Sequence, residues 1–171
     1  TRLLVGDAGI DNLQKAHVLI VGLGGVGSYA AEALCRAGIG ELTIVDGDVV
    51  DPTNRNRQLQ ALSTTHGMSK AKLMQERMLQ INPYVKLNVI SEFQDPEKMV
   101  ALLQQKFDYV IDAIDSITPK VHLIKTALEM GHSLVSSMGA GGKMDPTQLL
   151  VEDISKTRHC PMAYYLRKRL K

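Results

Sequence analysis

Several features of membrane-spanning and secreted proteins are missing from this sequence. It has no tryptophan, only two cysteines, and no uninterrupted apolar run near the roughly 18 residues that a membrane helix needs. Two cysteines cannot form a disulfide framework, and residues 1–11 lack the basic, apolar and small-residue regions of a signal peptide. We therefore expect a cytoplasmic protein with no membrane span.

Basic charge is unevenly distributed along the chain. The net charge is +2, but residues 156–171 hold six lysines and arginines and no acidic residue. Such a tail is typical either of a solvated helix face or of a surface that binds a polyanion. A helix is predicted to begin at Pro161 and to run to Lys171. Because that helix stops abruptly, we expect the chain to be cut from a longer protein, at both ends.

The length of 171 residues fits one domain, and its first third predicts a βαβ unit. Residues 16–21 form an apolar, β-branched run that predicts a buried strand. A glycine loop, an Ala-rich helix over 28–37 and a second apolar run over 42–45 follow. A right-handed crossover should connect these two strands.

The same alternation continues to about residue 137, and the pattern then changes. Two short runs, 142–144 and 148–151, flank the turn-forming sequence DPT and predict a hairpin. The sequence thus predicts a Rossmann-like α/β fold, with a mostly parallel sheet, helices on both faces and an appended antiparallel hairpin. The further strands are predicted over 85–90, 109–113 and 133–137, and the further helices over 69–81, 96–105 and 119–130.

The glycine loop, GLGGVG over residues 22–27, has the spacing of a nucleotide-binding turn. Gly22 permits the tight turn, Gly24 lets the backbone approach a phosphate, and Gly27 lets the helix pack closely on the sheet. Gly25 is grouped with them as a binding residue. A helix beginning at this loop also offers free N–H groups to an anion.

An acidic residue follows the second strand at the place where nucleotide-binding folds hold a ribose. Asp46 lies 24 residues past Gly22, near the spacing of about 20 expected for an acid that binds ribose hydroxyls. Asp48 is a second candidate. The alternative is a surface acid at a strand end.

Residues 54–58, NRNRQ, form a positive, amide-rich segment close to the glycine loop in sequence. A dinucleotide dehydrogenase does not need such a segment, because backbone N–H groups bind most of its pyrophosphate. A reaction that expels pyrophosphate needs fixed cations for the charge that grows on the leaving group. Asn54, Arg57 and Lys70 fit that role, and a set of surface charges at loop ends is the alternative.

These motifs together resemble the ThiF/MoeB family of ubiquitin-activating-like adenylyltransferases, over the whole chain. The resemblance implies one ATP-binding adenylation domain over residues 1–171, with ATP and Mg²⁺ as cofactors. It implies that Asp46 holds the ribose, that Asn54 and Arg57 bind the triphosphate, and that Lys70 contacts phosphate. Asp115 is implied to assist with Mg²⁺, so the implied catalytic residues are Arg57, Lys70 and Asp115.

Within the family, the sequences over 112–116, 139–142 and 145–148 look most like the tRNA threonylcarbamoyladenosine dehydratase branch. That resemblance implies an enzyme that adenylates the threonyl carboxylate of threonylcarbamoyladenosine in tRNA. Attack by the neighbouring carbamoyl group then closes a ring, with release of AMP and pyrophosphate overall.

Partners and competing functions follow from the same resemblance. It implies a tRNA substrate, a homodimer, and a cysteine desulfurase or sulfur-acceptor partner. One alternative is an adenylyltransferase that activates the C-terminus of a ubiquitin-like sulfur carrier, but Cys160 has Ala163 three residues on, so the Cys-x-x-Cys zinc pair common in that group is missing. A nicotinamide-dependent oxidoreductase is the third reading.

Overall fold

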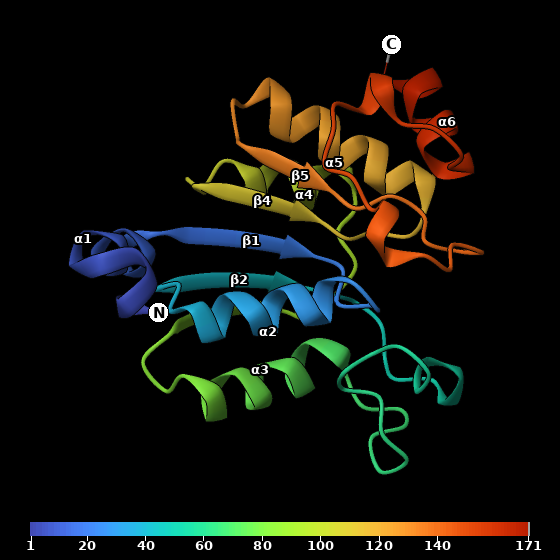
Figure 1. The fold of residues 1–171 in the computed structure, drawn as a ribbon. Helices are drawn as coiled ribbons and strands as arrows, with labels where there is room; N and C mark the ends of the chain where they lie inside the picture. The colour runs from blue at the N-terminus through green and yellow to red at the C-terminus, as the bar shows by residue number, and fades with distance from the viewer. Residues whose placement is uncertain (171) are drawn as a thin grey trace.

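The computed structural model describes residues 1–170, which form a five-stranded sheet of parallel strands with helices on both faces (Figure 1). The strand order is β3-β2-β1-β4-β5. Each strand lies within one residue of its predicted range, so the Rossmann-like α/β prediction is confirmed. The strands are β1 (His17–Val21), β2 (Glu41–Val45), β3 (Lys86–Ile90), β4 (Tyr109–Asp112) and β5 (Leu134–Ser136).

Five of the six helices match their predicted ranges to within two residues. The sixth, α1, was not predicted because none of its residues is buried and Gly6 interrupts it with φ of 68°. Lys171, the last residue of the predicted basic tail, lies outside the described residues. The helices are α1 (Arg2–Lys15), α2 (Gly27–Ala37), α3 (Lys70–Ile81), α4 (Pro96–Leu103), α5 (Ile117–Glu129) and α6 (Pro161–Arg169).

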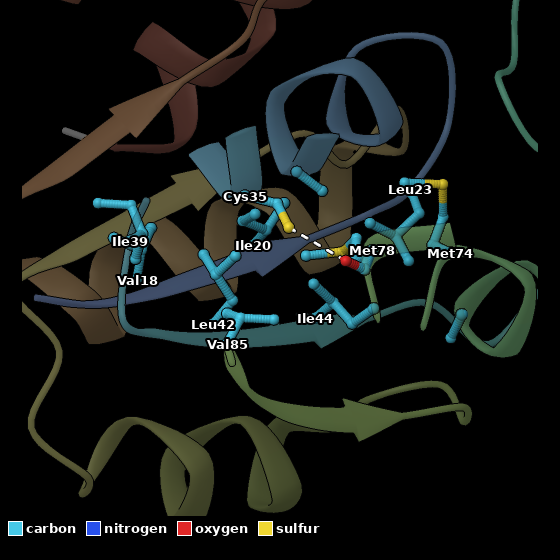
Figure 2. Packing of buried hydrophobic residues seen from close by; sticks show 12 residues of the cluster. Val18, Ile20, Leu23, Cys35, Ile39, Leu42, Ile44, Met74, Met78 and Val85 are labelled. Atoms are coloured by element: carbon cyan, nitrogen blue, oxygen red, sulfur yellow. Dashed lines mark hydrogen bonds between the residues drawn. The ribbon is translucent and has the colours of Figure 1, made fainter. Parts of the chain in front are cut away.

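Two apolar clusters attach the helices to opposite faces of the sheet. Alternate residues of β1 point to opposite faces, so Ile20 joins the cluster beneath α2 and α3, while Leu19 joins the cluster beneath α4 and α5. Figure 2 shows the first cluster, in which the Cys35 thiol donates a hydrogen bond to the Met78 carbonyl at 3.4 Å. Cys35 is therefore a core residue, as predicted.

The chain changes direction beside β1, and this places the candidate site. From β1 the chain adds β2 and β3 on one side, then crosses to add β4 and β5 on the other. In open parallel sheets, ligands bind at the carboxyl ends of the strands where the order reverses. The glycine loop and the loop after β4 meet there.

The appended hairpin is the one part of the fold prediction that was wrong. Residues 142–144 and 148–151 form no strand, and Pro146–Gln148 is a short 3-10 turn. The Asp145 carboxylate accepts hydrogen bonds from the backbone N–H and the hydroxyl of Thr147, at 3.0 and 2.6 Å. This local capping stabilises a turn without cross-strand pairing.

A buried ion pair fixes the loop between β4 and α5. The Lys120 ammonium lies 2.8 Å from the Asp112 carboxylate, and both side chains have no exposed surface. Ser136 donates to the same carboxylate at 2.6 Å, and Lys120 also donates to the Ile114 carbonyl at 2.9 Å. Burial raises the pKa of Asp112, while Lys120 and Ser136 oppose that shift. The pair therefore ties α5 to the strand ends beside the glycine loop.

No helix among residues 1–170 is long and apolar enough to cross a membrane.

Replacing Gly27 by alanine tests the packing of the glycine loop. Helix propensity alone favours alanine over glycine by about 1 kcal/mol. However, a Cβ on Gly27 would lie 1.7 Å from the Gly22 carbonyl oxygen, so we expect Gly27→Ala to destabilise the fold by about 3 kcal/mol. Gly141→Ala is the matched control, because nothing lies within 4 Å of its added Cβ. Denaturant unfolding of both variants measures the difference, and a neutral Gly27→Ala would contradict the contact.

Removing Lys120 tests the buried ion pair. We expect Lys120→Met to lower the free energy of unfolding by about 3–5 kcal/mol, because it leaves the Asp112 charge buried without a partner. Lys98→Met breaks an exposed pair with Glu92 of nearly the same length, 2.7 Å, and should cost far less, because solvent screens the pair. Adding Asp112→Asn to Lys120→Met should restore part of the loss. Equal costs for Lys120→Met and Lys98→Met in urea unfolding would show that burial does not matter here.

Candidate nucleotide-binding site

The glycine loop turns sharply at the end of β1 and leads directly into α2. Gly22 has φ of 91°, a conformation that glycine adopts without strain, and its N–H donates to the Val45 carbonyl at 2.8 Å. A Cβ there would meet the Ala113 carbonyl at 2.7 Å, so the loop after β4 packs against this turn. Within the described chain, no side chain caps the N-terminus of α2. The Ser28 N–H already donates to the Gly24 carbonyl at 3.2 Å, whereas the backbone N–H groups of residues 24–27 donate to no carbonyl of the described chain, so these loop N–H groups can bind an anion.

Asp46 joins the end of β2 to the glycine loop. One carboxylate oxygen accepts the Leu23 N–H at 2.6 Å, and the other accepts the Asp48 N–H at 2.8 Å. Burial raises the pKa of Asp46 although both hydrogen bonds act in the opposite direction. Each carboxylate oxygen can accept a second hydrogen bond. The residue predicted to hold a ribose thus positions the loop and retains acceptor capacity.

Lys70 and Asp48 form an ion pair beside Asp46. Lys70 is the first residue of α3, and Ser69 caps that helix. The Lys70 ammonium lies 3.0 Å from the Asp48 carboxylate, with the lysine side chain 7% exposed and the aspartate side chain 53% exposed. An ammonium has three N–H donors, so the pair leaves donors available. The structure brings these two predicted site residues together, although the sequence did not predict their pairing.

Asn54 and Arg57 hold the basic segment against the glycine loop. The Asn54 side-chain oxygen accepts the Asp51 N–H at 3.1 Å, which closes a short 3-10 turn over Pro52–Asn54 and leaves the amide N–H groups as donors. The stem of Arg57 lies over Gly25, where an added Cβ would be 3.2 Å from its Cγ. Its guanidinium donates to the Thr53 carbonyl at 3.1 Å. The guanidinium also donates to the Asn56 side-chain oxygen at 2.9 Å, so Arg57 is exposed with its stem on the glycine loop and its charged end fixed by its own segment.

Two glutamines that the sequence reading did not assign lie beneath the same loop. Gln58 and Gln60 are 7% and 4% exposed, and the Gln60 amide donates to the Leu23 carbonyl at 2.7 Å. The side-chain oxygens of both have no partner among the described residues. In the sequence they appear only as polar residues on either side of apolar Leu59. This pattern is common in surface loops and does not predict burial.

Asp115 makes no hydrogen bond or ion pair with the other candidates among the described residues. It is exposed, lies three positions after Asp112 in the loop that the Asp112–Lys120 pair closes, and takes part in no ion pair within residues 1–170. Across these residues there is no group of three or more His, Cys, Asp or Glu side chains that could hold a metal. Magnesium bound to phosphates needs only one or two carboxylates, so Asp115 alone meets that minimum. Asp112 is already engaged with Lys120.

The two cysteines lie outside this site. Cys35 is in the core beneath α2, and Cys160 caps α6, where its sulfur accepts the Ala163 N–H at 3.5 Å. Both are buried and free.

Comparison with known proteins agrees with this geometry. The tRNA threonylcarbamoyladenosine dehydratase of Escherichia coli strain K12 is 46% identical over 171 residues, which are 100% of this chain and 64% of the relative. The protein of the same name from Bacillus subtilis strain 168 is 44% identical over 169 residues, which are 99% of this chain and 66% of the relative. This chain therefore spans about two thirds of the length of these curated relatives.

A solved structure extends the comparison to three dimensions. The crystal structure of the E. coli dehydratase in complex with ATP has a TM-score of 0.96 and 45% identity to this chain, covering 99% of it and 70% of the solved chain. The ThiF family matches residues 2–169. With its glycine loop at the reversal point of a parallel sheet and this match over nearly its whole length, the chain belongs to the ThiF family.

Proposed function

We propose that this chain is the ATP-binding part of a tRNA threonylcarbamoyladenosine dehydratase. The observation that carries the proposal is the Arg57 side chain lying over Gly25, because it adds a fixed cation to a nucleotide-binding loop. The two relatives at 46% and 44% identity have that activity in their names. A tRNA substrate also fits the cytoplasmic location expected from the sequence.

The residues divide the work around the nucleotide. Asp46 accepts hydrogen bonds from the ribose, and the glycine loop with the N-terminus of α2 holds the phosphates. Asn54, Arg57 and Lys70 stabilise the charge that develops on departing pyrophosphate. The threonyl carboxylate oxygen attacks the α-phosphate of ATP and displaces pyrophosphate. The carbonyl of the resulting acyl-adenylate can then be attacked by the carbamoyl group. Asp48 orients Lys70 through their ion pair, in which the ammonium nitrogen and the carboxylate oxygen are 3.0 Å apart.

Magnesium belongs to this proposal through Asp115. Its carboxylate is exposed and unpaired within the described residues, and it follows the loop that packs on Gly22. It would hold the ion together with phosphate oxygens, and the ion would offset phosphate charge.

Ring closure does not require a protein nucleophile. The carbamoyl group and the activated carbonyl belong to the same side chain, and effective molarities of up to about 10⁸ M are known for such well-oriented groups. The two cysteines of the chain are buried away from the glycine loop, in the core and at the start of α6. Neither of these two cysteines is therefore placed to act as a nucleophile at the glycine loop.

Homodimer formation is a further part of the proposal. The face of β4 and β5 next to α1 carries an apolar groove of about 500 Å³, whose walls include Val5, Leu13, Tyr109 and Val135. Tyr109 and Val135 are 55% and 43% exposed. Apolar surface of this kind is covered in interfaces between copies of a chain.

A charge placed in this groove tests the dimer. In the full-length protein, Val135→Lys should weaken self-association by roughly tenfold or more, because it places a charge in an apolar contact. Lys72→Ala on α3 is the control away from the groove. Light scattering across a concentration series gives the mass, and a wild-type monomer at high concentration would refute the dimer.

Replacing Arg57 tests the proposed chemistry. In the full-length protein, Arg57→Ala should lower ATP-dependent conversion of threonylcarbamoyladenosine in tRNA by roughly 100-fold, because a fixed charge facing the leaving group is lost. Arg55→Ala is the matched control, since Arg55 is exposed in the same segment and does not lie over the loop. Product is measured by mass spectrometry of digested tRNA, and a wild-type rate for Arg57→Ala would remove it from the mechanism.

The same assay separates the competing functions. ATP–pyrophosphate exchange is measured with tRNA and with a ubiquitin-like sulfur carrier, and NAD is titrated against ATP. Exchange with the carrier protein alone would favour a sulfur-carrier activator, and tighter binding of NAD would favour an oxidoreductase.

A further inference from the structure

Helix α6 presents a basic and aromatic face that the nucleotide site does not use. Residues 154–170 contain no acidic side chain, and the last turn of α6 holds Arg167, Lys168 and Arg169. Two tyrosines on the same helix, Tyr164 and Tyr165, are 47% and 54% exposed. Adjacent aromatic rings that stay exposed to water are unfavourable on a merely solvated helix face, and such grouped apolar surface is typical of binding sites.

Arg167 attaches the segment that precedes α6 to the helix. Arg167 donates to the Thr157 carbonyl at 3.0 Å and to the Ile154 carbonyl at 3.4 Å, so residues 154–157 pack against α6. Lys156 and Arg158 flank Thr157 and are exposed. We define the α6 face as the exposed side chains of this unit, namely Lys156, Arg158, Tyr164, Tyr165, Lys168 and Arg169.

The aromatic rings are already arranged for contact with a flat, negatively charged ligand. The Lys168 ammonium lies 4.5 Å from the centroid of the Tyr164 ring, and the Tyr164 and Tyr165 rings meet edge to face with centroids 5.4 Å apart. Tyr165 makes no such contact with a lysine among the described residues, so its ring remains open to stacking. Cations beside stackable rings are the combination that binds single-stranded nucleic acid.

The α6 face adjoins the nucleotide site. Helix α6 packs on α5, as Figure 1 shows, and the Arg169 guanidinium donates to the Thr118 hydroxyl at 3.3 Å. Thr118 lies in the first turn of α5, three residues after Asp115. A polyanion on this face would therefore reach the edge of the candidate site.

We propose that the α6 face binds the tRNA substrate, with Lys168 and Arg169 on backbone phosphates and Tyr165 stacked on an unpaired base. This inference rests on the proposed dehydratase function and adds the surface that delivers the nucleoside to the ATP site. The choice of RNA over an acidic polypeptide comes from Tyr165, because a base stacks on its ring and a carboxylate does not.

The test compares two pairs of lysine and arginine substitutions in the full-length protein, with labelled tRNA and fluorescence anisotropy over a salt series. Lys168→Ala/Arg169→Ala should weaken binding about tenfold and reduce the slope of log K against log salt by about 2, because two phosphate contacts are lost. Lys72→Ala/Lys106→Ala removes the same charge from exposed positions elsewhere and should change neither quantity by more than about twofold. ATP affinity should stay at the wild-type value in both variants.

Tyr165 is tested separately. Tyr165→Leu should weaken tRNA binding about tenfold, and Tyr165→Phe should retain it, because only the ring is needed for stacking. Polyglutamate at equal charge should compete poorly. Unchanged binding in Tyr165→Leu together with strong competition by polyglutamate would overturn RNA in favour of an acidic protein partner.

The outcomes also separate this inference from the proposed function. Wild-type conversion of tRNA with unchanged binding in Lys168→Ala/Arg169→Ala would refute the α6 face alone. Equal losses from both pairs of substitutions would mean general charge attraction and would also refute it. Wild-type protein that fails to bind or convert tRNA would instead refute the dehydratase proposal.

Discussion

The glycine loop is held by a contact that leaves no space for a side chain. The Gly27 Cα lies so close to the Gly22 carbonyl that a Cβ would fall 1.7 Å from its oxygen. Because of this contact, α2 begins at Gly27, packed against the turn that follows β1, and the N–H groups of the loop face an open end of the sheet. Asp46 holds the same loop from β2, and the loop after β4 packs on its other side. Arg57 contacts the same loop through Gly25, and Gln60 contacts it through the Leu23 carbonyl.

Most of the sheet could be predicted from the sequence for a simple physical reason. Strands buried on both faces form short apolar runs, and residues 18–21 and 42–45 are runs of this kind, each followed by a glycine or an acid. The conformational demands of Gly22 and Gly27 also follow from their spacing. The predicted cradle and the site residues Asp46, Asn54 and Arg57 therefore fall at one edge of the sheet.

Other features depend on pairings between distant residues, which no local pattern encodes. Asp112 and Lys120 are eight positions apart and no local pattern predicts that they pair, yet both are buried as one ion pair. Gln60 reaches the Leu23 carbonyl across 37 positions of the chain. The hairpin prediction was wrong because Asp145-Pro146-Thr147 favours a tight turn in either context, and the side-chain hydrogen bonds of Asp145 stabilise the turn without strand pairing. Helix α1 gave no signal because it buries no residue.

Different residues hold the nucleotide and act on its phosphates in the proposed function. In our proposal the glycine loop and Asp46 bind any nucleotide, whereas the Arg57 guanidinium acts only on one whose polyphosphate is split. The most direct test is the affinity of wild-type and Arg57→Ala full-length protein for ATP and for AMP, measured by calorimetry. We predict that Arg57→Ala weakens ATP binding roughly tenfold or more and leaves AMP binding nearly unchanged, because a charge-assisted contact to the outer phosphates is lost. Equal losses for both nucleotides, or none for either, would contradict the account.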